Sequence, residues 1–554
     1  MTGRGIVGIW LAGVSLVWGA EKKYIGHGWD LLAVTPAEVL ANAEAFDATA
    51  LDGVTLCLKA TGADGKRYAY SSILTDPAWS RDVFADQIPI FQQIVKHPAL
   101  KESFLACFGA PNKRLAWRDD AAWATAVNNL KVLAGLAKAG GLRGVLIDHE
   151  DYPLTRQFQR LPEDPPYAEA AGLARKRGAE MMAAIGGAFP DVTVLSFWFL
   201  SMNRSLLNSD DPVTAAACAN DLWPAFFNGM LDALPPGARL IDGDEHAYRY
   251  EAARNDFFIS AWYQQNAALK LIAPENRIKY RTRMLTGFGL YLDMYINEEG
   301  APWYFGPLNG SRLAHLEANV RQATKVATEY IWLYGEKAPW IRWRSIAAER
   351  YADKPSWEDR LPGMTDALLG IKDPKIFLAR QLAALQKAGE LTNLAVSVTV
   401  RADEPLPPDG FRPDGLPAPW FCWHDDRLAK GTFGIDGKIG DGDTSSLCMK
   451  GVGSGCFGYP LNGVKPGERY IIRLAAKGLS PTATVSWQKN NVWQWSIPSA
   501  EILLPPEPTA EAWRHAETVV TIPDGINKLV ILLGAKQGPE DKTWFDRLEV
   551  YRCR

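Results

Sequence analysis

The sequence has little net charge, few residues of the kinds that bind metal ions, and no long apolar run in its body. Its 60 Lys and Arg nearly balance its 63 Asp and Glu, and a net charge of −3 gives no electrostatic reason to expect a nucleic acid or an anionic membrane as partner. The 7 His and 7 Cys show no CxxC or His/Cys spacing typical of zinc sites. After residue 20 no stretch approaches the about 18 uncharged apolar residues of a membrane-spanning helix. These absences favour a globular protein with neither a nucleic-acid nor a membrane partner.

Residues 1–20 have the composition of a secretory signal peptide. Arg4 supplies a positive charge, residues 6–18 form a short apolar core, and Gly19 and Ala20 are small residues suited to cleavage. We therefore expect a secreted or periplasmic protein, with an uncleaved membrane anchor as the alternative.

A regular alternation of short apolar runs and longer amphipathic stretches occupies residues 21–345. With 554 residues the chain is too long for one hydrophobic core, so two or more domains are expected. The alternation predicts parallel strands joined by helices, and the candidate strands are residues 24–32, 53–59, 104–109, 144–150, 192–200, 239–245, 284–293 and 330–336. Their number and spacing predict an α/β fold, a (β/α)8 TIM barrel. A doubly wound sheet is the rival, but the first strand is not followed by a glycine-rich phosphate loop.

The rest of the chain divides into two regions with different sequence patterns. Residues 346–419 are interpreted as a helical connector with a Pro-rich linker, and residues 420–554 contain short strands separated by turns, the pattern of an all-β sandwich. Four cysteines fall in this last part, so at least one disulfide is expected in an exported protein, with Cys422 and Cys553 as one pairing that would join the first and last strands.

Acidic side chains follow the predicted barrel strands at the ends where such barrels carry their active sites. The fourth strand ends at Asp148 and Glu150, Glu245 stands in an acidic run after the sixth, and the eighth ends at Glu336. Cleavage of a glycosidic bond needs one protonated carboxyl and one ionised carboxylate. The acids therefore predict a glycoside hydrolase acting on a poly- or oligosaccharide, with no cofactor required for catalysis.

Glu150 is predicted to be the general acid. It shares a strand face with Asp148 at a spacing of about 7 Å, and repulsion in a partly dry barrel mouth raises the pKa of one of the two. Glu245 or Glu336 is the second carboxylate; Glu245 is favoured because a sixth-strand residue faces the fourth strand across part of the mouth. The remaining side chains expected to contact substrate, several of them aromatic rings suited to stacking on sugars, are His27, Trp29, Asp30, Trp198, Asp242, Asp244, His246, Asp293, Trp332, Tyr334 and Trp340.

Structural roles compete at several of these positions. Asp148 can be a buried supporting residue, Asp242 can stabilise a loop, and Asp293 can cap a helix. His27 and His246 can be structural histidines held by hydrogen bonds.

Two stretches of the barrel region resemble known carbohydrate-active proteins. Residues 144–153 (GVLIDHEDYP) resemble the fourth-strand motif of the family 18 chitinases, which implies Glu150 as proton donor and Asp148 as its partner. Arg143 and Leu146 stand where that motif has two further aspartates. The phrases at 242–248 (DGDEHAY) and 332–340 (WLYGEKAPW) are similar to those of exported barrel proteins grouped with glycoside hydrolases.

The C-terminal region resembles jelly-roll carbohydrate-binding modules through residues 470–477 (YIIRLAAK) and 544–551 (WFDRLEVY). The resemblance implies a structural calcium near Asp546, and sugar stacking on Trp487, Trp493 or Trp495. A sandwich that only supports the barrel is the alternative.

Two other functions remain open from the sequence. One is a metal-dependent carbohydrate deacetylase or esterase with His149, His246 and the neighbouring aspartates as ligands. The other is a barrel that binds carbohydrate without catalysis.

Overall fold

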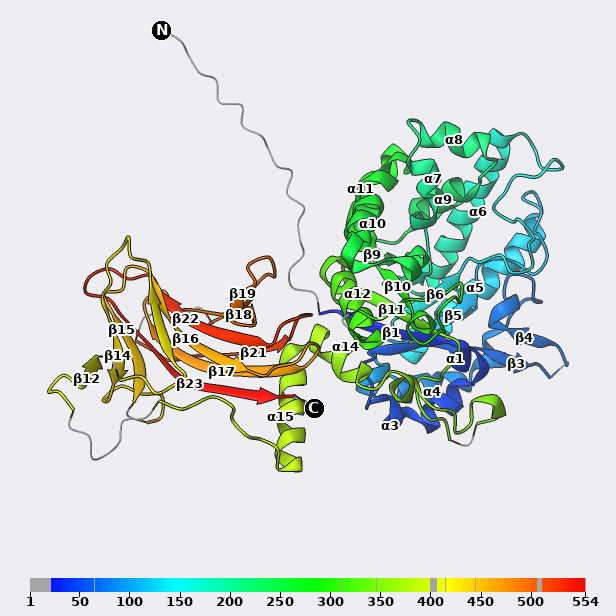
Figure 1. Cartoon of the computed structure of the whole chain (residues 1–554). Coiled ribbons are helices and arrows are strands. Elements are labelled where there is room, and N and C mark those ends of the chain that lie inside the picture. The colour runs from blue at the N-terminus through cyan, green and yellow to red at the C-terminus, as the bar shows by residue number, and fades with distance from the viewer. Residues whose placement is uncertain are drawn as a thin grey trace, which may run out of the picture. The chain divides into compact units, whose positions relative to one another are not determined.

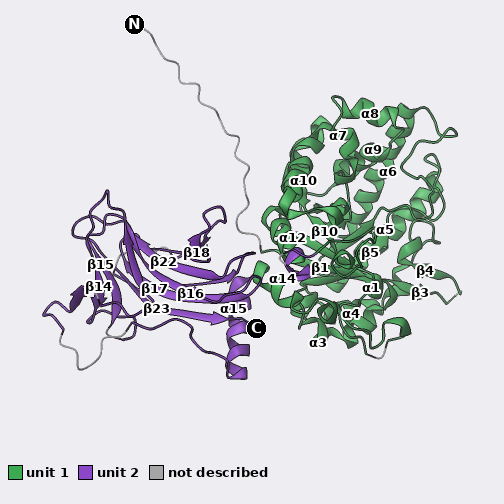
Figure 2. Ribbon diagram, in the orientation of Figure 1, with its two compact units in different colours: residues 1–306, 316–372 green, residues 307–315, 373–554 purple. Residues whose placement is uncertain are grey.

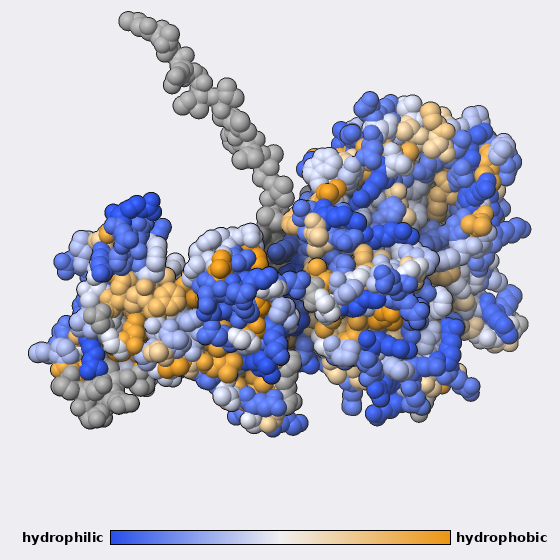
Figure 3. Space-filling view, viewed as in Figure 1, coloured by the Kyte–Doolittle hydropathy of each residue, from blue (hydrophilic) through white to orange (hydrophobic). Residues whose placement is uncertain are grey.

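The computed structural model describes residues 21–553 apart from residues 64, 309, 345, 399–405, 414, 444 and 506–510. The predicted signal segment therefore lies outside the described residues. Two compact units make up the chain (Figure 2): unit 1 comprises Met1–Gly306 and Leu316–Lys372, and unit 2 comprises Pro307–His315 and Asp373–Arg554. The search of the described helices finds none long and apolar enough to span a bilayer. Hydrophilic residues cover most of the face shown in Figure 3, with apolar residues in small groups.

Unit 1 is built on a parallel sheet that nearly closes into a barrel (Figure 1). The strands, in pairing order, are β10 (Phe288–Tyr291), β11 (Tyr330–Gly335), β1 (Lys23–Gly28), β2 (Gly53–Cys57), β5 (Phe104–Phe108), β6 (Gly144–Asp148), β7 (Thr193–Ser196), β8 (Arg239–Asp242) and β9 (Met284–Thr286). Each neighbouring pair is parallel. The two ends of this order, β9 and β10, are separated in the chain by Gly287 alone, so the sheet's edges come together. All eight predicted strand regions are present, and this confirms the mixed α/β class with a parallel, barrel-like sheet.

The seventh predicted strand is divided at Gly287. The Gly287 amide donates to the Asp242 carbonyl at 2.9 Å, continuing the pairing of β9 with β8, while β10 pairs with β11. A Cβ at this position would lie 2.9 Å from the Ile241 side chain and 3.1 Å from the Asp242 carbonyl oxygen. Glycine therefore permits the close approach at which one strand changes partner.

Helices separate the strands along the chain. The helices are α1 (Trp29–Ala33), α2 (Pro36–Ala41), α3 (Ala43–Phe46), α4 (Gln87–Ile94), α5 (Asp120–Gly140), α6 (Tyr167–Ala188), α7 (Arg204–Leu207), α8 (Pro212–Cys218), α9 (Trp223–Ala233), α10 (Asp256–Gln265), α11 (Arg277–Arg283), α12 (Arg312–Val326), α13 (Trp357–Arg360), α14 (Met364–Lys372) and α15 (Pro374–Ala388). Side-chain capping fixes the start of α5, where Asp119 accepts a hydrogen bond from the Ala122 amide, and Gly141 ends that helix with a φ of 75°. A hairpin of β3 (Lys59–Thr61) and β4 (Arg67–Ala69) follows β2.

Large side chains fill the interior of the barrel-like sheet. Trp332 on β11 is 1% exposed, stacks on Phe197 with ring centroids 4.2 Å apart, and donates its indole N–H to the Gly243 carbonyl. His27 on β1 contacts the Phe197 ring edge-on and shares a 2.9 Å hydrogen bond with Thr55. Trp332 and His27 were expected to contact substrate, but their burial makes them part of the packed floor beneath the strand ends.

Unit 2 contains two antiparallel sheets. The strand order in the first sheet is β12 (Phe411–Pro413), β14 (Thr432–Asp436), β15 (Ser446–Lys450), β23 (Lys542–Arg552), β17 (Arg469–Gly478) and β21 (Arg514–Thr521). The order in the second is β13 (Phe421–His424), β16 (Gly455–Asn462), β22 (Lys528–Ala535), β18 (Thr482–Lys489) and β19 (Val492–Trp493). In this second sheet β20 (Ala500–Glu501) also pairs with β18. Buried side chains of both sheets, among them Ile472 and Trp487, form one apolar core. The expected antiparallel β region is thus confirmed.

The helical segment before the sandwich is shared between the units. α13 and α14 belong to unit 1, and α15 belongs to unit 2, where Leu378 and Leu385 pack on Ile471 and Tyr551. The units thus divide between Lys372 and Asp373, inside the stretch that the sequence assigned to a connector.

The expected disulfide is not formed in this structure. The four late cysteines are recorded without a disulfide bond, and Cys448 is fully buried in β15. Cys422 lies on β13 in one sheet, whereas Cys553 follows β23 in the other. The proposed Cys422–Cys553 pairing would therefore have to join strands of different sheets.

Candidate active site

The acidic residues singled out by the sequence lie where the parallel strands of unit 1 end. β6 ends at Asp148, β8 at Asp242 and β11 at Gly335, directly before Glu336. Because parallel neighbours finish at the same edge of a sheet, the segments that follow these strands share one rim.

Asp148 and Glu150 are joined by their own backbone and by a tyrosine. The Glu150 amide donates to Asp148 Oδ1 at 2.9 Å, and the Tyr152 hydroxyl donates to Glu150 Oε2. Asp148 is 5% exposed. Burial and the charges of Glu150 and Glu245 hold the pKa of the Asp148 carboxyl well above its usual range. The charged form of Asp148 is therefore disfavoured, and its carboxyl positions the Glu150 backbone.

Glu245 is the second carboxyl whose ionisation is disfavoured. It follows Asp244, whose φ of 40° lies in the left-handed region, and its amide donates to the Phe197 carbonyl at 3.0 Å. Burial, followed by the charges of Glu150 and Asp244, raises the pKa of Glu245 from 4.5 to about 8. Glu150 is the predicted general acid, and the raised pKa makes Glu245 a second candidate for that role.

Glu336 occupies a separate place on the rim. The Tyr334 hydroxyl donates to Glu336 Oε1 at 2.8 Å, and the Glu336 amide donates to Asp293 Oδ2 at 2.8 Å. Asp293 also accepts from the Lys337 amide at 3.1 Å and is fully buried. Burial and the charge of Glu336 raise the pKa of Asp293 to about 6. Asp293 therefore fixes the backbone that carries Glu336 and is shielded from substrate.

Three tyrosines connect the two carboxylate groups. Tyr334 stacks on Tyr248 at 5.8 Å and on Tyr291 at 5.2 Å between ring centroids. The pKa of Tyr248 is held well above its usual range by burial and then by the charges of Glu245 and other neighbours, Glu150 among them. Tyr248 thus lies between the Glu150–Glu245 group and the Tyr334–Glu336 group.

Sequence reasoning did not select Tyr152, Tyr248 or Tyr291. Tyr152 and Tyr248 belong to phrases that had been noted for their resemblance, and Tyr291 shares its strand parity with Asp293. The sequence signals that could have selected these tyrosines were therefore proximity to a motif, for Tyr152 and Tyr248, and strand parity, for Tyr291.

Two of the predicted substrate contacts instead anchor the loops after the strands. Asp242 is fully buried and accepts hydrogen bonds from the Leu200 amide and from both the amide and hydroxyl of Ser201. Asp244 is also fully buried and accepts from the Tyr250 and Ser260 hydroxyls. These aspartates stabilise the backbone around Glu245 rather than facing a ligand.

Asp30, which follows β1, and Trp340, which follows β11, form a similar anchor. Asp30 Oδ2 accepts from the Trp340 amide and the Trp343 indole, each at 2.9 Å, and the Trp340 indole donates to the His27 carbonyl at 3.0 Å. Both Asp30 and Trp340 are buried. Of the predicted contacts, those with exposed surface are Glu150, Glu245, Glu336, Trp29, Trp198, His246 and Tyr334.

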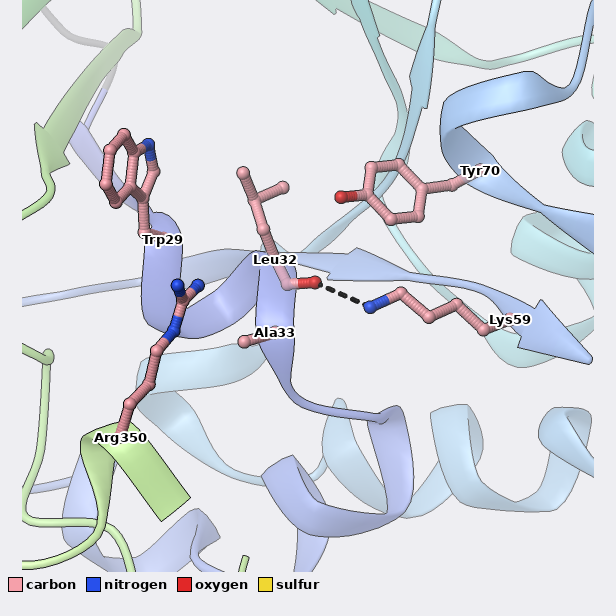
Figure 4. Close-up of a pocket in the computed structure, with 6 residues that line it drawn as sticks. All are labelled: Trp29, Leu32, Ala33, Lys59, Tyr70 and Arg350. Atoms are coloured by element: carbon pink, nitrogen blue, oxygen red, sulfur yellow. Dashed lines mark hydrogen bonds between the residues drawn. The ribbon is translucent and has the colours of Figure 1, made fainter. Parts of the chain in front are cut away.

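A pocket of about 580 Å³ opens beside this rim (Figure 4). Its lining residues come from the segment after β1, from β3, from the segment after β4, and from the chain before α13: Trp29, Leu32, Ala33, Lys59, Tyr70 and Arg350. Trp29, which is 44% exposed, also interacts with the Tyr334 hydroxyl. Trp29 therefore connects one wall of the pocket to Tyr334, the partner of Glu336.

No protein-family model matches the sequence, and no curated protein is similar to it. Solved structures overlap with about a quarter of the chain. The xylan-binding domain CBM22-1 of Paenibacillus barcinonensis Xyn10C is 14% identical, with 26% of this chain and 90% of that one covered and a TM-score of 0.21. A family 16 carbohydrate-binding module is 14% identical over 23% of this chain and 90% of that one, with a TM-score of 0.17. The active domain of bacteriophage CBA120 tailspike protein 4 is 12% identical over 24% of this chain, which spans only 19% of that protein, with a TM-score of 0.20. These values establish neither a family nor an activity.

The described residues do not assemble a recognisable metal site. No group of three or more His, Cys, Asp and Glu is placed to hold an ion within the part of the chain that the structure describes. His149, a ligand in the deacetylase alternative, is 2% exposed with its Nδ1 2.9 Å from the Ser196 hydroxyl, whereas His246 is exposed to solvent. These two histidines are not presented to a common ion.

Asp546, near which the resemblance implies a calcium ion, lies in a group of acidic side chains, and the calcium stays a prediction. Asp546 accepts from the backbone amides of Asp441 and Arg547, each at 2.7 Å. The Arg547 guanidinium lies 3.2 Å from the Asp441 carboxylate, which also pairs with His515 at 2.7 Å. The Arg547 guanidinium therefore offsets part of the negative charge of this acidic group, and, after burial, the charges of Asp443 and Asp441 still contribute to the raised pKa of Asp546.

Proposed function

We propose that this chain is a glycoside hydrolase in which Glu245 donates the proton to the leaving oxygen and Glu150 acts at the anomeric carbon, directly or through a water molecule. One observation carries the proposal. Two neighbouring carboxyls at the rim are coupled so that the charge of Glu150 helps to keep Glu245 protonated, with a pKa of about 8. A carboxyl that keeps its proton near neutral pH is what acid-assisted glycoside cleavage requires.

Other side chains would hold this pair in place. The Tyr152 hydroxyl orients the Glu150 carboxylate, and Asp148 accepts a hydrogen bond from the Glu150 amide. As the glycosidic bond breaks, the proton of Glu245 moves to the departing oxygen while negative charge at Glu150 stabilises the positive sugar ring. In this proposal unit 1 is a complete (β/α)8 barrel, and the tyrosines between Glu245 and Glu336 line the path of the glycan.

Kinetics of isosteric variants test the assignment. We expect Glu245→Gln to lose about 10²–10⁴ in rate on natural glycans and less on activated aryl glycosides, whose leaving groups need little protonation. Glu150→Gln should lose activity on both substrate kinds. Glu299→Gln, at an exposed position after β10, is the matched control and should behave as wild type.

The same assays separate the alternatives. Failure of the wild type to cleave any member of a broad panel of polysaccharides and aryl glycosides would refute the proposal, and binding without turnover would instead indicate a non-catalytic barrel. Release of acyl groups that stops on addition of a chelator would indicate a metal-dependent deacetylase. Near wild-type rates for Glu245→Gln on a natural glycan would overturn the role of Glu245.

We further propose that unit 2 binds carbohydrate through Trp495. Its ring is 73% exposed and is stacked on Trp493 with centroids 5.0 Å apart, so one face is held ready for a sugar. Trp487 is 4% exposed and donates its indole N–H to the Pro498 carbonyl, which makes it part of the core. The sugar stacking that the resemblance implies is therefore proposed for the stacked Trp493–Trp495 pair and not for Trp487.

A further inference from the structure

Side-chain contacts connect the pocket beside the rim to two of the rim carboxylates, the proposed catalytic Glu150 and Glu336. On one side Tyr70 contacts Phe108 edge-on at 5.6 Å, and Phe108 contacts Tyr152 at 5.4 Å between ring centroids. Tyr152 in turn donates its hydroxyl to Glu150. Tyr70, which lines the pocket, is therefore linked to Glu150 through two intervening aromatic rings.

The second route runs through Trp29. Its indole interacts with Tyr334, whose hydroxyl donates to Glu336 at 2.8 Å. The exposed Trp29 ring forms one wall of the pocket, and an indole face is suited to the apolar face of a pyranose ring. The pocket therefore has the position and the wall of a sugar subsite.

The charge of this pocket is opposite to that of the rim. Among the described residues that line it, the titratable ones besides Tyr70 are Lys59 and Arg350, and both are exposed. The Lys59 ammonium donates to the Leu32 carbonyl at 3.1 Å, which leaves two of its three N–H groups for other partners (Figure 4). The Arg350 guanidinium lies 4.7 Å from the centre of the Tyr351 ring. Neither cation has an ion pair among the described residues.

Unpaired cations beside a group of carboxylates select for an anionic ligand. A negatively charged sugar would be repelled by Glu150 and Glu336 unless cations neutralise it, and arginine can bind a carboxylate or sulfate through two parallel N–H groups. We propose that this pocket is a subsite for a sugar unit carrying a carboxylate or sulfate group. The inference rests on the proposed hydrolase function, because it assigns the substrate class of the same site.

Calorimetric titration at low salt tests the subsite without requiring turnover. The probes are oligosaccharides of galacturonic acid and of sulfated galactose, each compared with neutral galacto-oligosaccharides of equal length; the protein is full-length Glu245→Gln, so that no probe is consumed. We expect at least one acidic series to bind about tenfold or more tightly than the neutral series, with an affinity that falls as salt is raised. Which series binds more tightly distinguishes a carboxylate from a sulfate.

Variants that lack the two pocket cations test whether these side chains cause the preference for acidic probes. Adding Lys59→Gln and Arg350→Gln to the same protein should abolish the preference for acidic probes and leave neutral binding unchanged. The matched control is Lys131→Gln with Arg281→Gln, two exposed cations on α5 and α11 that do not line the pocket. Thermal melting of each variant verifies that the fold is retained.

The results separate the subsite from the hydrolase proposal. Equal binding of acidic and neutral probes, no binding of either, or an acidic preference that survives loss of both cations would overturn the subsite. Acid-selective binding that depends on Lys59 and Arg350, in a wild-type protein that cleaves no glycan, would uphold the subsite and refute the hydrolysis.

Discussion

Replacement of Glu245 by glutamine is expected to stabilise unit 1 at alkaline pH while abolishing its proposed chemistry. The folded-state pKa of Glu245 is about 8, above the ordinary value of 4.5. The folded protein therefore binds more protons than the unfolded chain between these two pH values. The contribution of this carboxyl to stability is complete below pH about 4.5, falls as pH rises through the interval, and stays low above pH about 8.

The size of the effect follows from the shift. At about 1.4 kcal/mol per pKa unit, a rise from 4.5 to about 8 corresponds to about 5 kcal/mol of destabilisation when Glu245 is ionised. The carboxyl retains some solvent exposure, and screening reduces the expected gain from Glu245→Gln to about 2–3 kcal/mol above pH 8. The neutral amide has nearly the same shape, and no hydrogen bond to another described residue ties the Glu245 carboxyl in place.

Urea unfolding followed by tryptophan fluorescence measures this gain at pH 5, 7 and 9. The variant should match wild type at pH 5 and exceed it increasingly at pH 7 and 9, in the transition assigned to unit 1. Glu299→Gln controls for the loss of an ordinary surface charge. In a Glu150→Gln background the benefit should shrink, because the charge of Glu150 is one cause of the shift. A stability difference that is the same at all three pH values would refute the reasoning.

Three further predictions follow from the same contacts. If Glu245 must be protonated, kcat/KM should fall as pH rises past about 8, and a pH–rate profile with no fall between pH 7 and 10 would contradict the acid assignment. Asp293→Ala should lower the free energy of unfolding of unit 1 by about 2–4 kcal/mol, because it removes the acceptor of two backbone amides; Asp293→Asn, which keeps one carbonyl, should lower it less in the same urea titration. Trp495→Ala should abolish retardation in polysaccharide affinity gels at unchanged Tm, whereas Trp487→Ala should lower the Tm of unit 2; retardation that persists in Trp495→Ala would argue against the exposed ring as the binding face.

The elements that depend on local pattern were predictable. Strands such as residues 144–150 are short apolar runs between helical stretches, and α6 begins at Tyr167, where its amphipathic pattern predicts it. The split of the seventh strand was not predictable, since it depends on the close approach of Gly287 to Ile241 in a different strand. Periodicity reports which face of an element is apolar and carries no information on which distant backbone will pack against it.

The sequence by itself determined which residue types stand at the strand ends, because chain order places Asp148, Glu150 and Glu336 directly after apolar runs. Only the tertiary structure decided their roles. Protonation depends on burial and on neighbouring charges that are remote in sequence, and these raise the pKa of Glu245 through Glu150, 95 positions earlier in the numbering. Likewise the sequence left Asp242 and Asp293 open between substrate contact and a structural role, and only folding encloses them beneath loops whose amides need acceptors. Burial and charge proximity are properties of the folded chain, and they are what distinguish a reacting carboxyl from a structural one.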